Sequence, residues 1–190
     1  QSGQLVGEAS GAYLTSPESP LLIYGDNPQA KFIILLRNPA DRAYSLYKWM
    51  RIHGYETAEC FRDALLLENS RVCNDTFFHD NPQYFYNYLY FTTGLYINYI
   101  TNYLRVFGKK QCLFLISEQL FSEPMTVIQI VLRHLEVDPF CDVPFEQVNR
   151  SADVFPRLDA DLRRQLLDRY DDSIQELSHV LGLDLRRIWI

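Results

Sequence analysis

The chain has 190 residues, of which 47% are hydrophobic, and its 18 basic and 24 acidic side chains give a formal net charge of −6. This length is sufficient for one sizeable core and too short to suggest two, so residues 1–190 are predicted to form a single domain. The acidic balance argues against general nucleic-acid binding, which requires a basic surface. No membrane segment is predicted in these residues.

The first half of the chain is predicted to contain two strands among several helices. An uninterrupted apolar run from Phe32 to Leu36 is typical of a strand buried in a parallel sheet. Clustered Asn, Asp and Pro residues near position 80 indicate a polar loop. In chain order, we expect a short strand over Leu5–Glu8, a helix over 17–24, a central strand over 31–37, helices over 41–53 and 57–72, and a polar loop over 74–83.

The second half is predicted to add one strand and three helices. Aromatic and aliphatic residues at helical spacing indicate a helix over 94–107, and a second buried strand is expected over 112–116. A helix over 125–135 precedes a turn, and Asp159 is the expected N-cap of the last helix. The apolar stripe of that helix consists of Leu162, Leu166, Tyr170, Ile174, Leu177 and Leu181.

A cation ends the central strand. Arg37 follows Leu36 directly, and Pro39 stops the strand there. Ligands of open α/β sheets bind beside the carboxyl ends of the strands, where a helix N-terminus favours an anion. A guanidinium donates two parallel hydrogen bonds to a phosphate, and Ser45 on the following helix is within reach of such an anion. The sequence therefore predicts a phosphate clamp of Arg37 and Ser45, with an ion pair between Arg37 and Asp41 as the structural alternative.

Three segments carry recognisable motifs. The strand end and its helix form the pattern Arg-x-Pro-x-x-Arg-x-x-Ser-x-Tyr, which comprises Arg37, Pro39, Arg42, Ser45 and Tyr47. An earlier segment, 7–14, contains Gly-Glu-Ala-Ser-Gly-Ala-Tyr-Leu, and a later one runs from Gly-Leu-Tyr at 94–96 to Ser-Glu-Gln-Leu at 117–120. In this order they resemble motifs of the sulfotransferases that use 3′-phosphoadenosine 5′-phosphosulfate (PAPS), closest to the heparan/chondroitin-type branch and its bacterial relatives.

The resemblance implies an α/β fold in which helices flank a parallel sheet, similar to that of the P-loop nucleotide kinases. It implies that Arg37 and Ser45 bind the 3′-phosphate of PAPS and that no metal is required. Tyr96 is expected to help hold the adenosine. The implied reaction is in-line transfer of a sulfuryl group from PAPS to a hydroxyl or amine of an acceptor, which leaves adenosine 3′,5′-bisphosphate.

The resemblance also implies a nucleotide contact from the loop over 149–157. Ala152 and Asp153 stand where the vertebrate members have a Lys-Gly pair, so Arg150 or Arg157 is the expected cation. The alternative is that both are ordinary solvated arginines. In the Gly-Glu segment, Glu8 is expected near the acceptor or beside the groups that bind it, and a structural ion pair is its alternative role.

The family's 5′-phosphosulfate loop, with its Lys, and its catalytic base lie upstream of the Gly-Glu segment. No comparable Lys-rich loop occurs in this chain, so both are expected before Gln1 and the catalytic base is assigned to no residue here. A sheet without its first strand would leave an apolar edge uncovered, which favours a longer catalytic domain. A non-catalytic nucleotide-binding module and a kinase-like phosphotransferase are the alternatives. A glycan, a small molecule or a carrier-bound chain is the expected acceptor.

Cysteine spacing and aromatic content leave two further questions open. Cys60 and Cys73 could form a disulfide in an oxidising compartment, so a Golgi-lumen location is the alternative to the cytoplasmic one that we expect. The Tyr-rich stretch over 83–91 could line an acceptor pocket, although packing into the core is the expected role.

Overall fold

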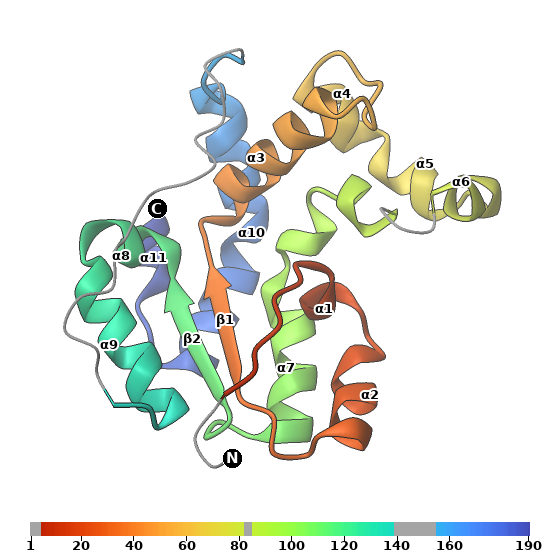
Figure 1. The fold of residues 1–190 in the computed structure, drawn as a ribbon. Coiled ribbons are helices and arrows are strands. Elements are labelled where there is room, and N and C mark those ends of the chain that lie inside the picture. Colours follow the sequence, from red (N-terminus) through yellow and green to blue (C-terminus); the bar gives the residue numbers. More distant parts are fainter. Residues whose placement is uncertain (1–4, 82–84, 139–154) are drawn as a thin grey trace.

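The computed structural model describes residues 5–81, 85–138 and 155–190. Within this part of the chain, two parallel strands form the sheet, β1 (Phe32–Leu36) and β2 (Cys112–Ile116). They pair in line, from Phe32 opposite Cys112 to Leu36 opposite Ile116. Both strands were predicted at these positions. Because the strands are parallel and in register, the residues that follow them, Arg37 and Ser117, leave the same edge of the sheet (Figure 1).

Helices flank this sheet, which confirms the predicted α/β class. In chain order they are α1 (Ala12–Thr15), α2 (Ser19–Asp26), α3 (Pro39–Ile52), α4 (Phe61–Leu66), α5 (Glu68–Val72), α6 (Asp75–Asp80), α7 (Tyr96–Phe107), α8 (Ser117–Ser122), α9 (Pro124–Leu135), α10 (Ala160–Leu181) and α11 (Leu185–Trp189), with 3-10 turns η1 (Phe85–Tyr88) and η2 (Thr92–Gly94). Figure 1 shows α7 beside β1 with α2 on the far side of α7, α8 and α9 beside β2, and α10 and α11 behind the sheet.

The core lies on one face of β1. Ile34 and Leu36 are buried there together with residues of α3, α7 and α10. The predicted apolar stripe of α10 is confirmed, since all its members except the half-buried Leu181 are buried. On the opposite face of β1, Ile33 and Leu35 are 43% and 48% exposed.

Three predicted elements are corrected by the structure. Leu5–Glu8 is no strand, because the segment pairs with neither β1 nor β2 and its side chains are exposed. The helix expected over 57–72 is two short helices, α4 and α5, which meet at Leu67. The polar loop expected over 74–83 contains α6, because the side chain of Asn74 caps that helix by accepting a hydrogen bond from the N–H of Phe77.

The Tyr-rich stretch packs mainly inward where the structure describes it. Tyr88 is 4% exposed and Tyr90 is fully buried, whereas Tyr86 is 37% exposed. Core packing is thus confirmed as the role of Tyr88 and Tyr90.

Candidate functional site

The side chain of Arg37 stands at the carboxyl edge of the sheet. It is exposed, and within residues 5–81, 85–138 and 155–190 it forms no ion pair or side-chain hydrogen bond. The alternative pairing with Asp41 is wrong, because Asp41 binds Arg163 instead. Arg163 donates from Nε and Nη2 to the two carboxylate oxygens of Asp41, both at 2.9 Å. Among the described residues, therefore, no carboxylate occupies the guanidinium of Arg37.

Helix α3 begins directly after this strand end. The side chain of Asn38 accepts hydrogen bonds from the N–H groups of Ala40 and Asp41, at 3.0 and 3.2 Å, and Pro39 occupies the first helical position. Ser45 follows on the second turn of α3, four residues after Asp41 and so on the same face. Its side chain is half-buried. Arg37 and Ser45 are thus linked by one short strand-to-helix connection, and their joint contact with a phosphate stays a prediction.

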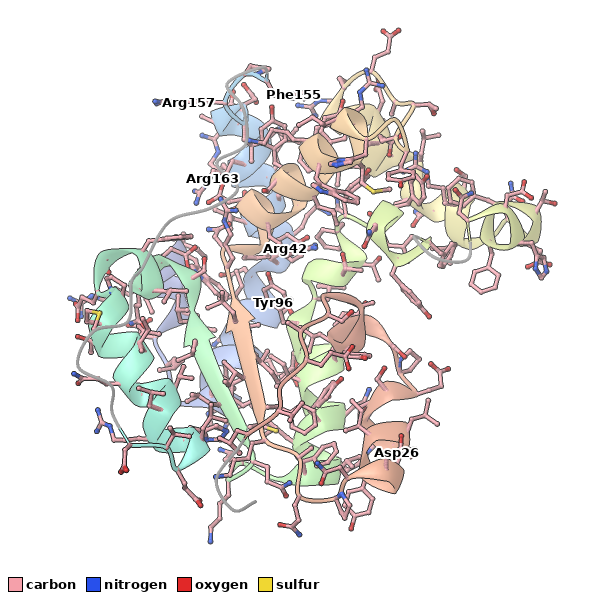
Figure 2. All side chains as sticks on the ribbon, in the orientation of Figure 1. Asp26, Arg42, Tyr96, Phe155, Arg157 and Arg163 are labelled. Atoms are coloured by element: carbon pink, nitrogen blue, oxygen red, sulfur yellow. The ribbon has the colours of Figure 1, made fainter. Side chains whose placement is uncertain are left out.

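Arg42, the second arginine of the motif, points toward Tyr90 and Thr93. Its Nη2 donates to the carbonyl oxygen of Tyr90 at 2.7 Å and to the hydroxyl of Thr93 at 2.9 Å. Its Nε is buried and has no hydrogen-bond partner in the described part of the chain. Arg42 therefore fixes α3 to the segment that includes η2. Figure 2 labels Arg42, Arg163 and Tyr96 near the carboxyl end of β1.

Tyr96 contacts the main chain of Arg37. The Tyr96 side chain is 4% exposed, and its hydroxyl donates a hydrogen bond of 3.0 Å to the carbonyl oxygen of Arg37. Burial raises the pKa of this phenol, so it remains a donor at neutral pH. The hydroxyl holds the end of β1, and the contact of Tyr96 with adenosine stays a prediction.

The segment before α10 lies against α3. The hydroxyl of Tyr44 donates to the carbonyl oxygen of Pro156 at 2.6 Å, and Asp159 caps α10 as predicted, accepting from the N–H of Leu162 at 2.8 Å. Arg157 is exposed and lines a cavity of about 360 Å³. Tyr44, Tyr47, Glu59, Cys60, Phe61, Arg62, Phe155, Pro156, Leu158, Asp159 and Leu162 also line this cavity. Arg150 lies outside the described residues.

Glu8 is on the exposed N-terminal segment. Its carboxylate accepts a hydrogen bond of 2.6 Å from the hydroxyl of Tyr13, which raises the pKa of that phenol. The partner of Glu8 is thus a phenol of α1, and its role near an acceptor stays a prediction.

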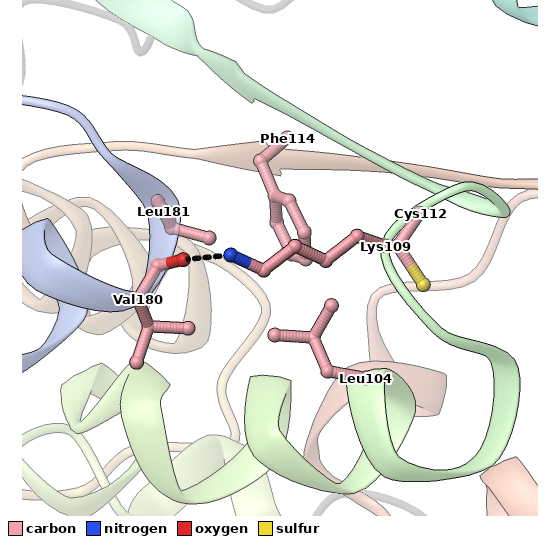
Figure 3. A pocket seen from close by; sticks show the side chains of 6 residues that line it. All are labelled: Leu104, Lys109, Cys112, Phe114, Val180 and Leu181. Carbon is pink, nitrogen blue, oxygen red and sulfur yellow. Dashed lines mark hydrogen bonds between the residues drawn. The ribbon is translucent and has the colours of Figure 1, made fainter.

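A smaller cavity lies at the other end of the strands. It measures about 180 Å³, and Figure 3 shows its six lining residues, among them Cys112, the first residue of β2. Lys109 crosses it to donate a hydrogen bond of 3.0 Å to the carbonyl oxygen of Val180 near the end of α10. Because it opens at the amino end of the strands, this cavity is separate from the Arg37 edge.

Three residues near the Arg37 edge were missed as site residues by the sequence analysis: Arg163, Glu118 and Trp189. Arg163 forms an ion pair with Asp41, and the other two residues contact Asn38.

Across the described ranges, no group of three or more His, Cys, Asp or Glu side chains could hold a metal ion. None of the helices in these ranges is long and apolar enough to cross a membrane. Cys60 and Cys73 are free thiols, so no disulfide joins them.

Comparison with known proteins gives consistent matches. A family model described as "Sulfotransferase domain" matches residues 17–151. A bifunctional heparan sulfate N-deacetylase/N-sulfotransferase 1 from Caenorhabditis elegans is 26% identical over 145 residues, which cover 76% of this chain and 16% of that protein. Heparan sulfate glucosamine 3-O-sulfotransferase 6 from Mus musculus is 30% identical over 122 residues, which cover 64% of this chain and 32% of that protein.

A solved structure supports the same assignment. The crystal structure of a sulfotransferase from Alicyclobacillus acidocaldarius superimposes with a TM-score of 0.79 at 29% sequence identity, covering 95% of this chain and 66% of that one. The chain thus matches less than a third of the length of the two curated relatives and about two thirds of the solved one. Since the family model matches well over half of the chain, the protein belongs to the sulfotransferase family.

Proposed function

We propose that the protein transfers a sulfuryl group from PAPS to a hydroxyl or amine of an acceptor. The observation that carries the proposal is the exposed guanidinium of Arg37 at the carboxyl edge of the sheet, eight residues before Ser45. The nearby carboxylate that could have captured it, Asp41, is bound by Arg163. Membership of the sulfotransferase family supports the reaction type.

The side chains present at this edge fit a nucleotide phosphate. A guanidinium offers two parallel N–H groups to a phosphate, and a hydroxyl can donate one more hydrogen bond. Arg37 and Ser45 provide this donor set from the strand end and the second turn of α3. Arg157 stands on the segment that Tyr44, the neighbour of Ser45, holds against α3, so it is the cation we assign to the same nucleotide. Arg150 remains a prediction of the same kind.

PAPS supplies the sulfuryl group when it is bound, and the residues of this chain bind and orient it. Arg37 and Ser45 hold the 3′-phosphate, a group that ATP lacks, and so select the donor. Such fixed positioning is a large part of catalysis by group-transfer enzymes. The catalytic base and the lysine that holds the phosphosulfate are assigned to no residue of this chain.

The acceptor class is proposed from the relatives. The two curated relatives described above are named for heparan sulfate, so a glycan is the first acceptor class to test. A small molecule and a carrier-bound chain remain further candidates. A cytoplasmic location stays a prediction, with the Golgi lumen as its alternative.

Titration calorimetry with adenosine 3′,5′-bisphosphate tests the proposal. The wild-type protein should bind this nucleotide without added metal and in preference to Mg-ATP. Arg37→Ala should weaken binding by about 1.5–3 kcal/mol, the range for hydrogen bonds to charged groups, or about ten- to a hundredfold. Arg105→Ala, which removes an exposed arginine from the last turn of α7, is the matched control and should bind like the wild type.

Three results would contradict the proposal. Unchanged affinity of a folded Arg37→Ala variant would remove Arg37 from the site. Preference for Mg-ATP would favour a phosphotransferase. Tight bisphosphate binding without sulfuryl transfer by the full-length protein would favour a non-catalytic nucleotide-binding module.

A further inference from the structure

One carboxylate joins the ends of both strands at the Arg37 edge. Glu118 is the second residue after β2, and its Oε1 accepts a hydrogen bond of 3.0 Å from the main-chain N–H of Asn38. Its Oε2 accepts a hydrogen bond of 3.3 Å from the indole Nε1 of Trp189. Both oxygens of this half-buried carboxylate therefore have N–H donors from other parts of the chain.

The C-terminal helix completes the same contact. Trp189 is 3% exposed, and its carbonyl oxygen accepts a hydrogen bond of 2.8 Å from Nδ2 of Asn38. Asn38 is 2% exposed, and its remaining side-chain atom caps α3. Three segments that are distant in sequence, at the end of β1, the end of β2 and the end of α11, thus meet at Asn38.

These contacts fix the peptide that follows the Arg37 side chain. The carbonyl of Arg37 and the N–H of Asn38 belong to one peptide group, which is planar. Tyr96 donates to the carbonyl oxygen and Glu118 accepts from the N–H, both at 3.0 Å. Because both polar atoms are held, this peptide cannot rotate without breaking one of these two partly buried hydrogen bonds. The backbone at Arg37 is therefore held in one orientation before any ligand binds.

We infer that Glu118 and Trp189 are positioning residues for the phosphate clamp. They lock the Arg37–Asn38 peptide, so that the guanidinium of Arg37 is presented to the 3′-phosphate of the nucleotide. This inference rests on the proposed function. A preorganised group loses less freedom when it binds, and affinity for the group that it contacts rises accordingly.

The arrangement also gives the carboxylate of Glu118 donors other than Arg37. Leu36 pairs with Ile116, so Arg37 and Ser117 are the first residues after their strands, and Glu118 follows Ser117. The charges of Arg37 and Glu118 therefore lie at the same edge of the sheet. Both carboxylate oxygens of Glu118 are engaged by the N–H groups of Asn38 and Trp189. The acidic side chain thus holds the main chain and leaves the guanidinium available to the phosphate.

The experiment compares two ligands in three variants. Calorimetry measures the dissociation constants of adenosine 3′,5′-bisphosphate and of adenosine 5′-phosphate, which lacks the 3′-phosphate. Glu118→Ala should weaken bisphosphate binding about tenfold, corresponding to about 1.4 kcal/mol, and leave adenosine 5′-phosphate binding unchanged. Trp189→Phe, which removes only the indole donor, should lower the preference for the bisphosphate in the same direction. Glu118→Gln should be intermediate, because its single carbonyl oxygen can accept from only one of the two N–H groups.

The preference ratio, defined as the dissociation constant of adenosine 5′-phosphate divided by that of the bisphosphate, separates a positioning role from an effect on stability alone. A variant that is only less stable binds both nucleotides more weakly, whereas a misplaced Arg37 affects only the ligand with a 3′-phosphate. Glu123→Ala, which removes an exposed carboxylate directly after α8, is the matched control and should retain the wild-type ratio. If Glu118→Ala does not fold, Trp189→Phe decides.

Two outcomes overturn the inference, and they are distinguishable. An unchanged ratio in folded Glu118→Ala or Trp189→Phe, together with a lowered ratio in Arg37→Ala, would refute the positioning role alone. No preference for the bisphosphate in the wild type, with Arg37→Ala behaving like the wild type, would refute the proposed function and the inference with it.

Discussion

Replacing Arg71 by methionine should destabilise the fold by about 3–5 kcal/mol, because it leaves a buried carboxylate without its cation. Glu56 is 2% exposed and Arg71 6% exposed, and Nη2 of Arg71 donates to Oε1 of Glu56 at 2.7 Å. The N–H of Ala58 donates to the same oxygen at 2.8 Å, and the hydroxyl of Tyr90 donates to Oε2 at 2.8 Å. Methionine is shorter but of similar volume, so the main expected loss is the cation beside Glu56, together with the contacts of the guanidinium with the rings of Phe77 and Tyr88.

This ion pair supports the proposed site through one intermediate residue. The carbonyl oxygen of Tyr90 accepts from Arg42 on α3, the helix that carries Ser45. A local loosening around Glu56 would therefore also reach the start of α3. In a protein of this size the loss should lower the melting temperature by about 6–20 °C.

The dependence on pH identifies the cause. Burial of Glu56 acts to raise its pKa, but hydrogen bonds from Arg71, the N–H of Ala58 and Tyr90 outweigh burial, and the pKa is lowered from its ordinary value of 4.5. In the wild type this carboxylate thus stabilises the fold above pH 4.5, and its contribution is lost as the pH falls through the lowered pKa. In Arg71→Met the cation is missing, so burial should raise the pKa of Glu56. The variant should therefore regain stability as the pH falls and the carboxyl of Glu56 takes up a proton.

Urea unfolding at pH 7 and at pH 4.5 measures the effect. The difference in unfolding free energy between wild type and Arg71→Met should be largest at pH 7 and smaller at pH 4.5. The double variant Glu56→Gln/Arg71→Met should lose less stability at pH 7 than Arg71→Met alone, because it carries no buried charge. Arg62→Met, at an exposed position of α4, is the control and should change stability by about 0.5 kcal/mol or less. If Arg71→Met lost little unfolding free energy at pH 7, or lost the same amount at pH 7 and at pH 4.5, the reasoning would be refuted.

Two further predictions concern packing and thiol chemistry. Gly94→Ala should destabilise the fold by about 1–3 kcal/mol in urea unfolding, because its Cβ would lie 2.5 Å from the hydroxyl oxygen of the fully buried Tyr170. The double variant with Tyr170→Phe should regain part of this loss, and an unchanged midpoint for Gly94→Ala would contradict the predicted clash. Burial raises the pKa of the Cys112 thiol to about 11, so iodoacetamide at pH 8 should label the exposed Cys60 and Cys73 first and Cys112 only in denaturant. Peptide mapping by mass spectrometry checks this order, and equal labelling rates would contradict it.

The strands were predictable because Cys112–Ile116 and the residues from Phe32 to Leu36 are continuous apolar runs, which are typical of parallel strands. The exposure of Ile33 and Leu35 on one face of β1 was not predictable from such a run. Helix α6 was not predictable in this way, since its short polar sequence resembles a loop. It is stabilised by the Asn74 cap and by the ring of Phe77, which contacts the ring of Tyr88 at a centroid distance of 5.0 Å.

The candidate site shows the same division between local and distant contacts. The strand end before Arg37 and the helix that carries Ser45 were predictable because a strand, a proline and a helix follow one another directly. Arg163 was not, because it binds Asp41 from 122 positions further along the chain and resembles any arginine of an amphipathic helix. Trp189 had no sequence signal either, since its contacts with Asn38 and Glu118 span 151 and 71 positions.

An acidic protein can present a free guanidinium only if the carboxylates around it are engaged by other donors. At the Arg37 edge, Asp41 is bound by Arg163 and the oxygens of Glu118 accept N–H groups of Asn38 and Trp189. Among the described residues no carboxylate pairs with Arg37, so under the proposed function a phosphate would have no ion pair among them to displace. Hydrogen bonds to charged groups are worth about 1.5–3 kcal/mol each, so such a pair would oppose binding. The net charge of −6 is thus compatible with an anionic ligand. What Arg37 can bind depends on how the individual charges at this edge are paired, and not on the net charge of the chain.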